Sequence, residues 1–60
     1  MELFAGKWYI GKSLGPFKLV KITPTSKLNQ APVFHVLING NETPTILTLE
    51  EIRQEKPRQA

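Results

Sequence analysis

The sequence predicts an all-β fold, a small barrel of four to five bent antiparallel strands with one 3₁₀ or helical turn near the C-terminus. Short β-favouring runs alternate with Gly, Pro and Asn turn signals along the chain. The clearest run is Val33–Ile38, which lies between Pro32 and Asn39-Gly40. Proline is tolerated at the first residue of a strand, and Asn-Gly is a strong signal for a tight hairpin turn. We therefore expect this run to be the central strand, with the others paired on either side.

Length and composition indicate one folded domain without disulfides. Sixty residues, 40% of them hydrophobic and 22% charged, fit a single domain with a small core. Cysteine is absent, which excludes disulfides and thiolate metal sites, and a lone histidine does not build a zinc site. We expect one domain over residues 1–55, a frayed polar tail over residues 56–60, and no metal or other cofactor.

Nothing in the sequence points to a membrane. No apolar run approaches the roughly 20 residues of a membrane-spanning helix. The start of the chain lacks the basic segment and uninterrupted apolar core of a signal peptide. We therefore expect a soluble cytoplasmic protein with no membrane partner.

The first predicted strand covers residues 7–10, between two glycines. Trp8 and Ile10 point to one side of an extended chain and Tyr9 to the other. A single tryptophan in a small domain is most often an anchor in the core or at its rim, and this is our interpretation of Trp8; the alternative is a binding-surface aromatic. Residues 11–16, reading GKSLGP, have the composition of a loop.

The second predicted strand, Phe17–Thr23, does not alternate cleanly between apolar and polar residues. A β-bulge near Leu19-Val20 would restore the pattern, and bulges are common where a strand bends. With the bulge, the inward residues are Phe17, Leu19 and Ile22, and the outward residues are Lys18 and Lys21. The alternative is a strand covered on both faces, which requires a partner chain.

The central strand is apolar on both faces. Phe34, Val36 and Ile38 line one face, while Val33, His35 and Leu37 line the other. The second face is apolar enough to suggest partial cover by a terminus or by a neighbouring subunit. The preceding residues 24–30 form a polar loop with Leu28 as its one apolar anchor.

The last predicted elements are a strand over Thr45–Leu49 and a short helical turn. Thr48 followed three residues later by Glu51 is a capping-box pattern, which marks the start of a helix. Leu49 and Ile52 are spaced to face the core from a single helical or 3₁₀ turn.

These elements predict a core around one centre and resemble a known architecture. The expected core residues are Trp8 or Tyr9, Phe17, Leu19, Ile22, Phe34, Val36, Ile38, Leu47, Leu49 and Ile52. A meander of bent strands that ends in one turn of helix is similar to SH3-like barrels. The resemblance implies a bulged sheet that closes fully or nearly so.

Positive charge gathers in the first two thirds of the chain. Residues 1–41 hold five lysines and one acid, whereas residues 42–60 hold four acids and three cations. This asymmetry is compatible with a basic face for nucleic acid, and equally with a solubilising lysine surface. The candidate nucleic-acid-binding residues are Lys7, Lys12, Lys18, Lys21, Trp8 and Tyr9. Since no arginine occurs before Arg53, binding should tolerate sequence differences and depend strongly on salt.

A protein interface is the competing hypothesis. Val33, His35 and Leu37 would form an apolar strand face, and such exposed faces usually mark interfaces. A homodimer, a subunit of a larger protein complex, or a small regulator of phage-like or plasmid-like size would use that surface. An enzyme is hard to build here, because His35 is the only histidine and no catalytic constellation accompanies it. The Gly11–Gly15 string lacks the upstream glycine of a P-loop, so we predict no catalytic residues.

The segments GPFKLVKI (Gly15–Ile22) and PVFHV (Pro32–Val36) resemble the C-terminal SH3-like domains of retroelement integrases. In that family a strand opens with Gly-Pro-Phe or Gly-Pro-Tyr, and some elements carry a later Val-Phe-His-Val. The resemblance implies binding of DNA in preference to RNA and a part in multimer assembly, with Lys18 and Lys21 on the DNA side. In this chain a further strand and the TLEEI turn follow the second segment, whereas in the family that segment closes the barrel.

Overall fold

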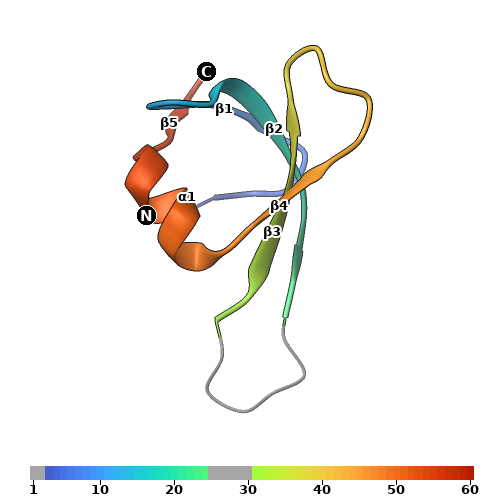
Figure 1. Cartoon of the computed structure of the whole chain (residues 1–60), viewed down its shortest axis with the longest axis vertical. Coiled ribbons are helices and arrows are strands. Elements are labelled where there is room, and N and C mark those ends of the chain that lie inside the picture. The colour runs from blue at the N-terminus through green and yellow to red at the C-terminus, as the bar shows by residue number, and fades with distance from the viewer. Residues whose placement is uncertain (1–2, 25–30) are drawn as a thin grey trace.

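The computed structural model describes residues 3–24 and 31–60, and its main element is one five-stranded sheet (Figure 1). In chain order the elements are β1 (Trp8–Gly11), β2 (Gly15–Thr23), β3 (Val33–Ile38), β4 (Thr45–Leu47), α1 (Leu49–Glu55) and β5 (Arg58–Gln59). The strands lie in the order β4-β3-β2-β1-β5, and every neighbouring pair is antiparallel. The predicted all-β class is therefore confirmed at this level. The predicted loop around Leu28, and Lys27 with it, lies outside the described residues.

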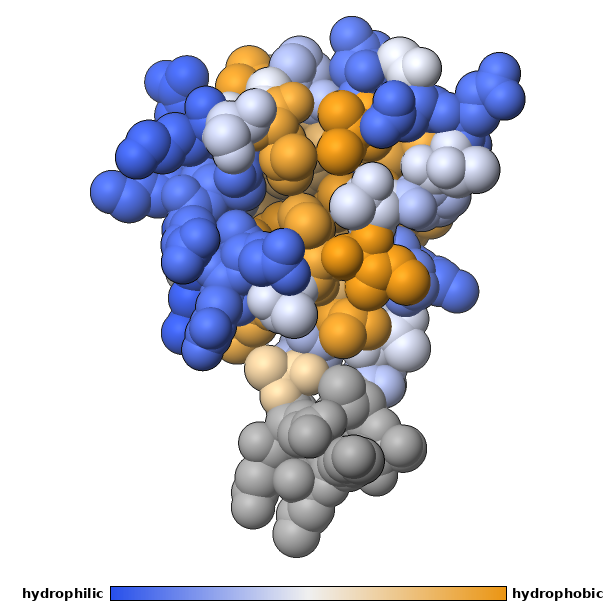
Figure 2. Space-filling view, in the orientation of Figure 1, coloured by the Kyte–Doolittle hydropathy of each residue, from blue (hydrophilic) through white to orange (hydrophobic). Residues whose placement is uncertain are grey.

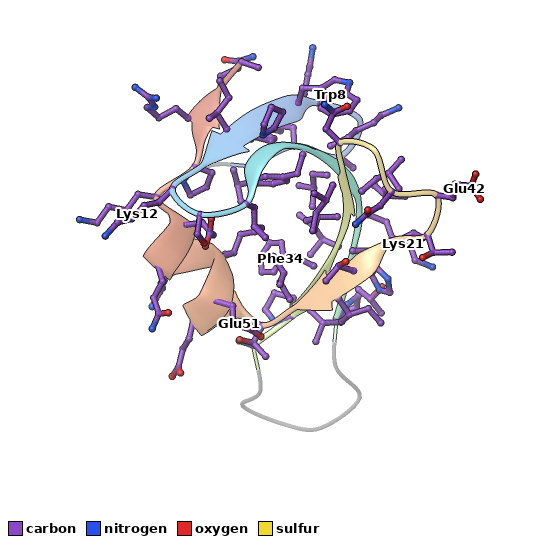
Figure 3. All side chains as sticks on the ribbon, turned by 45° about the horizontal axis from the view of Figure 1, so that its top comes forward. Trp8, Lys12, Lys21, Phe34, Glu42 and Glu51 are labelled. Atoms are coloured by element: carbon purple, nitrogen blue, oxygen red, sulfur yellow. The ribbon has the colours of Figure 1, made fainter. Side chains whose placement is uncertain are left out.

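The sheet is strongly bent, and α1 lies between its two edge strands. β4 and β5 form the edges and are not paired with each other, so the hydrogen-bonded sheet is open. Figure 3 shows the strands and α1 arranged in a ring with Phe34 at its centre. The chain passes from β4 through α1 to β5, so the helix spans the gap that the strands leave (Figure 1).

The predicted bulge in β2 is present. Leu19 pairs with β3 and so does Lys21, but Val20 between them has no partner residue. The extra residue lets Leu19 and Ile22 both face inward and keeps Lys21 outward. Ile22 lies opposite buried Phe34, as this register requires. It is nevertheless 39% exposed, because it is the last inward residue of β2, so the expectation that it is buried was wrong.

Seven apolar side chains form the core: Tyr9, Phe17, Leu19, Phe34, Val36, Leu47 and Ile52. Tyr9 is only 4% exposed, and its ring is tilted against that of Phe17 with the centroids 6.0 Å apart. Its hydroxyl accepts a hydrogen bond from the N–H of Phe4 at 2.8 Å, which satisfies the polar end of a buried tyrosine. Trp8 is 42% exposed and does not belong to the buried cluster, so of the two predicted positions, core or rim, the core is excluded. Ile38 packs against the core only partly buried.

Helix α1 begins with the predicted capping box and is longer than the single turn we expected. The Glu51 N–H donates to the Thr48 hydroxyl at 3.2 Å, and the Thr48 N–H donates to the Glu51 carboxylate at 3.1 Å. Ile52 is fully buried, while Leu49 is partly buried against the core. Because Thr48 caps the helix, β4 ends at Leu47 instead of at the predicted Leu49.

The end of the chain is part of the sheet, which corrects the expected frayed tail. β5 pairs with β1, with Arg58 opposite Ile10. The Ala60 N–H also donates to the carbonyl of Trp8 at 3.2 Å. A strand at the edge of a sheet offers free backbone groups, and β1 uses these groups to hold the C-terminal segment.

Candidate nucleic-acid interface

The outer face of the sheet, which we define as the surface turned away from the core, carries most of the predicted site. Partner residues on neighbouring antiparallel strands point to the same side of a sheet, so the register identifies this face. The members that the register identifies are Trp8, Ile10, Pro16, Lys18, Lys21, Thr23, Val33, His35, Leu37, Ile46 and Arg58. The bulged Val20 has no register partner, and we count it with this face because it is exposed. None of them belongs to the buried core.

Trp8 and Lys18 lie next to each other on the outer face. Lys18 is the β2 partner of Trp8, and Leu37 is the β3 partner of Lys18. Directly opposed side chains of this kind have Cβ atoms about 5 Å apart. The indole is 42% exposed and Figure 3 shows it pointing away from the centre of the ring. A ligand on this face therefore meets an aromatic surface and an ammonium group together.

A second row of side chains crosses the same face further along β2. Lys21 lies opposite His35, and His35 lies opposite Ile46 on the edge strand β4. Thr23 Oγ1 and His35 Nε2 are hydrogen-bonded at 2.9 Å, which fixes the orientation of the imidazole ring. Ile46 is 60% exposed. This row therefore offers a cation, an imidazole and an apolar side chain.

Charge is divided between the sheet and the helix. The five strands contain three cations, Lys18, Lys21 and Arg58, and no acidic residue. Helix α1 instead contains three glutamates and one arginine. Lys7 and Lys12 flank β1, and both are exposed. The outer face is therefore positive, with no carboxylate on its own strands to cancel that charge.

The six predicted nucleic-acid-binding residues do not all lie together. Those that share the outer face are Trp8, Lys18 and Lys21. Lys7 is exposed directly before β1. Lys12 lies in the turn after β1, and Figure 3 shows it on the opposite side of the ring from Lys21. Tyr9 is buried in the core, so its ring has no free face on which a base could stack.

The predicted protein-interface residues lie on the same outer face. They are Val33, His35 and Leu37, all on β3. Each is half-buried. Their outer-face neighbours Val20 and Ile46 are 40% and 60% exposed. The nucleic-acid and protein hypotheses therefore concern one continuous surface.

Arg58 is a residue of this surface that the sequence analysis missed. It lies opposite Ile10 on β5 and is exposed. An open groove of about 280 Å³ at this edge is lined by Ile10, Gly11, Lys12, Glu55, Lys56 and Arg58. The sequence signal for this strand was too weak to use, because two residues after Pro57 cannot display a strand pattern.

The Gly11–Gly15 turn holds a carboxylate of the chain itself. Glu55 accepts hydrogen bonds from the Ser13 N–H at 2.8 Å, from the Leu14 N–H at 2.9 Å, and from the Ser13 hydroxyl. The Lys12 N–H adds a backbone bond to the Glu55 carbonyl at 2.8 Å. The Ser13 hydroxyl, followed by the Leu14 and Ser13 amides, lowers the pKa of Glu55 below its ordinary value. These bonds fasten the end of α1 to the β1–β2 turn.

Apolar surface is also exposed beside the helix. Figure 2 shows an apolar band next to the hydrophilic residues on the α1 side of the molecule. The apolar side chains that are only partly buried against the core are Leu3, Leu14, Ile38 and Leu49. An open groove of about 420 Å³ is lined by Ala31, Pro32, Val33, Thr48, Leu49, Glu50 and Arg53. Its lining holds one acid and one base and points to no particular ligand.

Apart from these surfaces, little in the part of the chain that the structure describes points to a function. Within residues 3–24 and 31–60, no three His, Cys, Asp or Glu side chains gather as ligands for a metal ion. The one helix in those ranges has seven residues, which is too short to cross a bilayer. Comparisons with protein-family models, with curated proteins and with solved structures found no significant match. The resemblances to SH3-like barrels and to retroelement integrases stay predictions.

Proposed function

We propose that this chain is a non-enzymatic nucleic-acid-binding module that acts through the outer face of its sheet. The observation that carries the proposal is the pair formed by Trp8 and Lys18. An exposed indole and a lysine stand on directly opposed residues of strands that contain no acidic residue. DNA is the proposed partner in preference to RNA, on the strength of the resemblance to integrase domains.

The proposed fold is an SH3-like barrel. A bulged β2 supports this proposal, because bulges allow a sheet to bend toward closure. The position of α1 between the two edge strands supports it as well, since the helix covers the place where the strands do not pair.

The chemistry of the outer face favours binding that is electrostatic and tolerant of sequence. Lys18 and Lys21 can neutralise phosphates and release counterions, and the released ions make the affinity depend on salt. Trp8 can stack on any base, because every base has an aromatic face. Direct reading of base edges usually requires bidentate groups such as arginine, and β1, β2, β3 and β4 contain none.

The direct test replaces the outer-face lysines by glutamine and measures binding of a labelled oligonucleotide by fluorescence anisotropy. We expect Lys18→Gln with Lys21→Gln to weaken binding by about ten-fold or more and to reduce the salt slope by about 1 to 2. The matched control is Arg53→Gln on α1, which removes one positive charge away from the outer face and is compared with Lys18→Gln alone. Equal losses in these two single variants would show that net charge, and not this face, governs binding.

A protein interface on β3 is the second candidate, and the exposed apolar residues Val20 and Ile46 favour it. The partner would be a second copy of the chain or a larger complex, as expected for a small regulator or subunit. Leu37→Lys should then abolish self-association or partner binding, whereas the double lysine variant should leave it nearly unchanged. Sedimentation of the wild type and of Leu37→Lys measures the homodimer. A monomeric wild type would remove that partner from consideration.

A further inference from the structure

We propose that the ligand is a single strand of nucleic acid, with one base stacked on Trp8 and its flanking phosphates held by Lys18 and Arg58. This inference rests on the proposed function and specifies its substrate class. It also assigns a binding role to Arg58, which belongs to the C-terminal strand β5.

The register places cations on both strands that neighbour the indole. Trp8 lies on β1, which pairs with β2 on one side and β5 on the other. Lys18 is directly opposite Trp8. Arg58 is opposite Ile10, which is two residues further along β1 on the same face, so Arg58 is a diagonal neighbour of the indole. Neighbouring strands are about 4.8 Å apart, so the two cations stand on strands about 10 Å apart with the aromatic ring between them.

This arrangement suits a base that is free to stack. In a duplex the faces of the bases are covered by their neighbours, and only the edges and the phosphates are accessible. In a single strand the faces are accessible, and stacking on aromatic side chains is the usual source of affinity that does not depend on sequence. An exposed indole with a cation on each side matches the single strand, whereas a duplex would use the cations alone.

The open groove at the same edge provides a continuation for the backbone. Three of its six lining residues, Lys12, Lys56 and Arg58, are cationic. Its one acidic residue, Glu55, already accepts three hydrogen bonds from the β1–β2 turn. A strand that leaves Trp8 across β5 therefore enters a region with an excess of positive charge.

Trp8 is the only tryptophan, so its fluorescence reports on the proposed contact in the unmodified chain. The probes are an oligothymidylate of about ten nucleotides and a duplex of matched length, both at low salt. We expect the single strand to quench the indole fluorescence. We expect the duplex to bind at least about ten-fold more weakly, because it lacks the stacking contribution.

Two substitutions test the assigned residues. Trp8→Leu keeps an apolar side chain but removes the aromatic face, and should weaken single-strand binding by roughly five-fold or more with little effect on the duplex. Arg58→Gln should reduce the single-strand salt slope by about 0.7, the value for one phosphate contact. Arg53→Gln is the matched control on α1 and should leave the slope unchanged. Amide NMR spectra establish that each variant is folded.

The possible outcomes distinguish a failure of the single-strand inference from a failure of the proposed nucleic-acid-binding function. If the duplex binds as tightly as the single strand and the indole is not quenched, the inference is wrong, while a lysine-dependent affinity leaves the proposed function intact. If Arg58→Gln and Arg53→Gln have the same slope, the role of Arg58 is wrong. If neither nucleic acid binds at low salt, the proposed function fails and this inference fails with it.

Discussion

The two faces of the sheet come from the same strands but have opposite properties. In β2, Phe17 and Leu19 are fully buried, whereas Val20 and Lys21 are exposed. In β1, Tyr9 lies in the core while its neighbour Trp8 is exposed on the outer face. The inner face supplies nearly all of the buried cluster, so stability depends on it. The outer face is therefore free to carry cations and an exposed indole, which are the groups that we propose bind nucleic acid.

A single extra residue in β2 makes this separation possible. With strict alternation, Leu19 and Lys21 would point to the same side of the sheet. An inward Lys21 would bury an ammonium group without a partner, which is costly. Because Val20 is bulged, the lysine turns outward and Ile22 turns inward.

The largest predicted difference between the faces is seen when leucine is shortened on each. Leu19→Ala should lower the free energy of unfolding by about 2–5 kcal/mol, because it removes a fully buried side chain and leaves a cavity. Leu37→Ala on the half-buried outer face should cost less than half of that. Urea unfolding followed by Trp8 fluorescence measures both. Equal losses would mean that the outer face also supports the fold.

Gly11 should show the next largest effect, because there the core meets the end of the helix. A Cβ at this residue would lie 2.6 Å from Glu55 Oε1 and 3.3 Å from Phe17 Cε1. The Glu55 carboxylate can move away only by giving up its hydrogen bonds to the β1–β2 turn, so Gly11→Ala should lower the free energy of unfolding by about 1–3 kcal/mol. The same unfolding experiment tests this value. A variant as stable as the wild type would mean that the hydrogen bonds of the Glu55 carboxylate to the turn add little to stability.

Glu55→Gln should change how stability depends on pH. The folded pKa of Glu55 is below its ordinary value of 4.5, so the ionised carboxylate stabilises the folded chain. That contribution is present above the unfolded pKa and is lost as the pH falls through the folded pKa. As the pH is lowered from neutral to acidic, the melting temperature of Glu55→Gln should therefore fall less than that of the wild type. Glu42→Gln, in the exposed connection before β4, is the control and should retain the wild-type profile.

The smallest effect is expected for an isosteric change on the outer face. Val20→Thr should alter the free energy of unfolding by less than about 0.5 kcal/mol, since the side chain is exposed. Val36→Thr makes the same change at a fully buried site and should cost about 1–3 kcal/mol. The urea midpoints of the two variants measure how much more the inner face contributes to stability than the outer face, because both substitutions keep the shape of the side chain.

Much of the fold could be predicted because its signals are local. The run from Val33 to Ile38, the bulge after Leu19 and the capping box at Thr48 each depend on residues within a short window. Alternation also showed that Trp8 and Tyr9 face opposite sides. Alternation could not show which of the two residues faces inward, because that depends on which aromatic ring packs against Phe17. In the structure it is the ring of Tyr9.

The missed features depend on contacts that are distant in sequence. The hydrogen bond between the Ser13 amide and Glu55 joins residues 42 positions apart, and no local sequence pattern predicts it. β5 is too short to display alternation, so Arg58 was assigned to a frayed tail. Lys12 was grouped with Lys21 because the sequence does not show how the bent sheet places distant residues. The two lie on opposite sides of the ring (Figure 3).

An amide NMR titration of the wild-type chain with single-stranded and duplex DNA would show whether the outer face of the sheet binds nucleic acid. It should be run at low salt and at about 200 mM salt. We expect shifts at Trp8, Lys18 and Lys21 that weaken as the salt concentration rises, with little change along α1. Shifts confined to α1, or none at either salt concentration, would contradict the claim that the outer face binds nucleic acid.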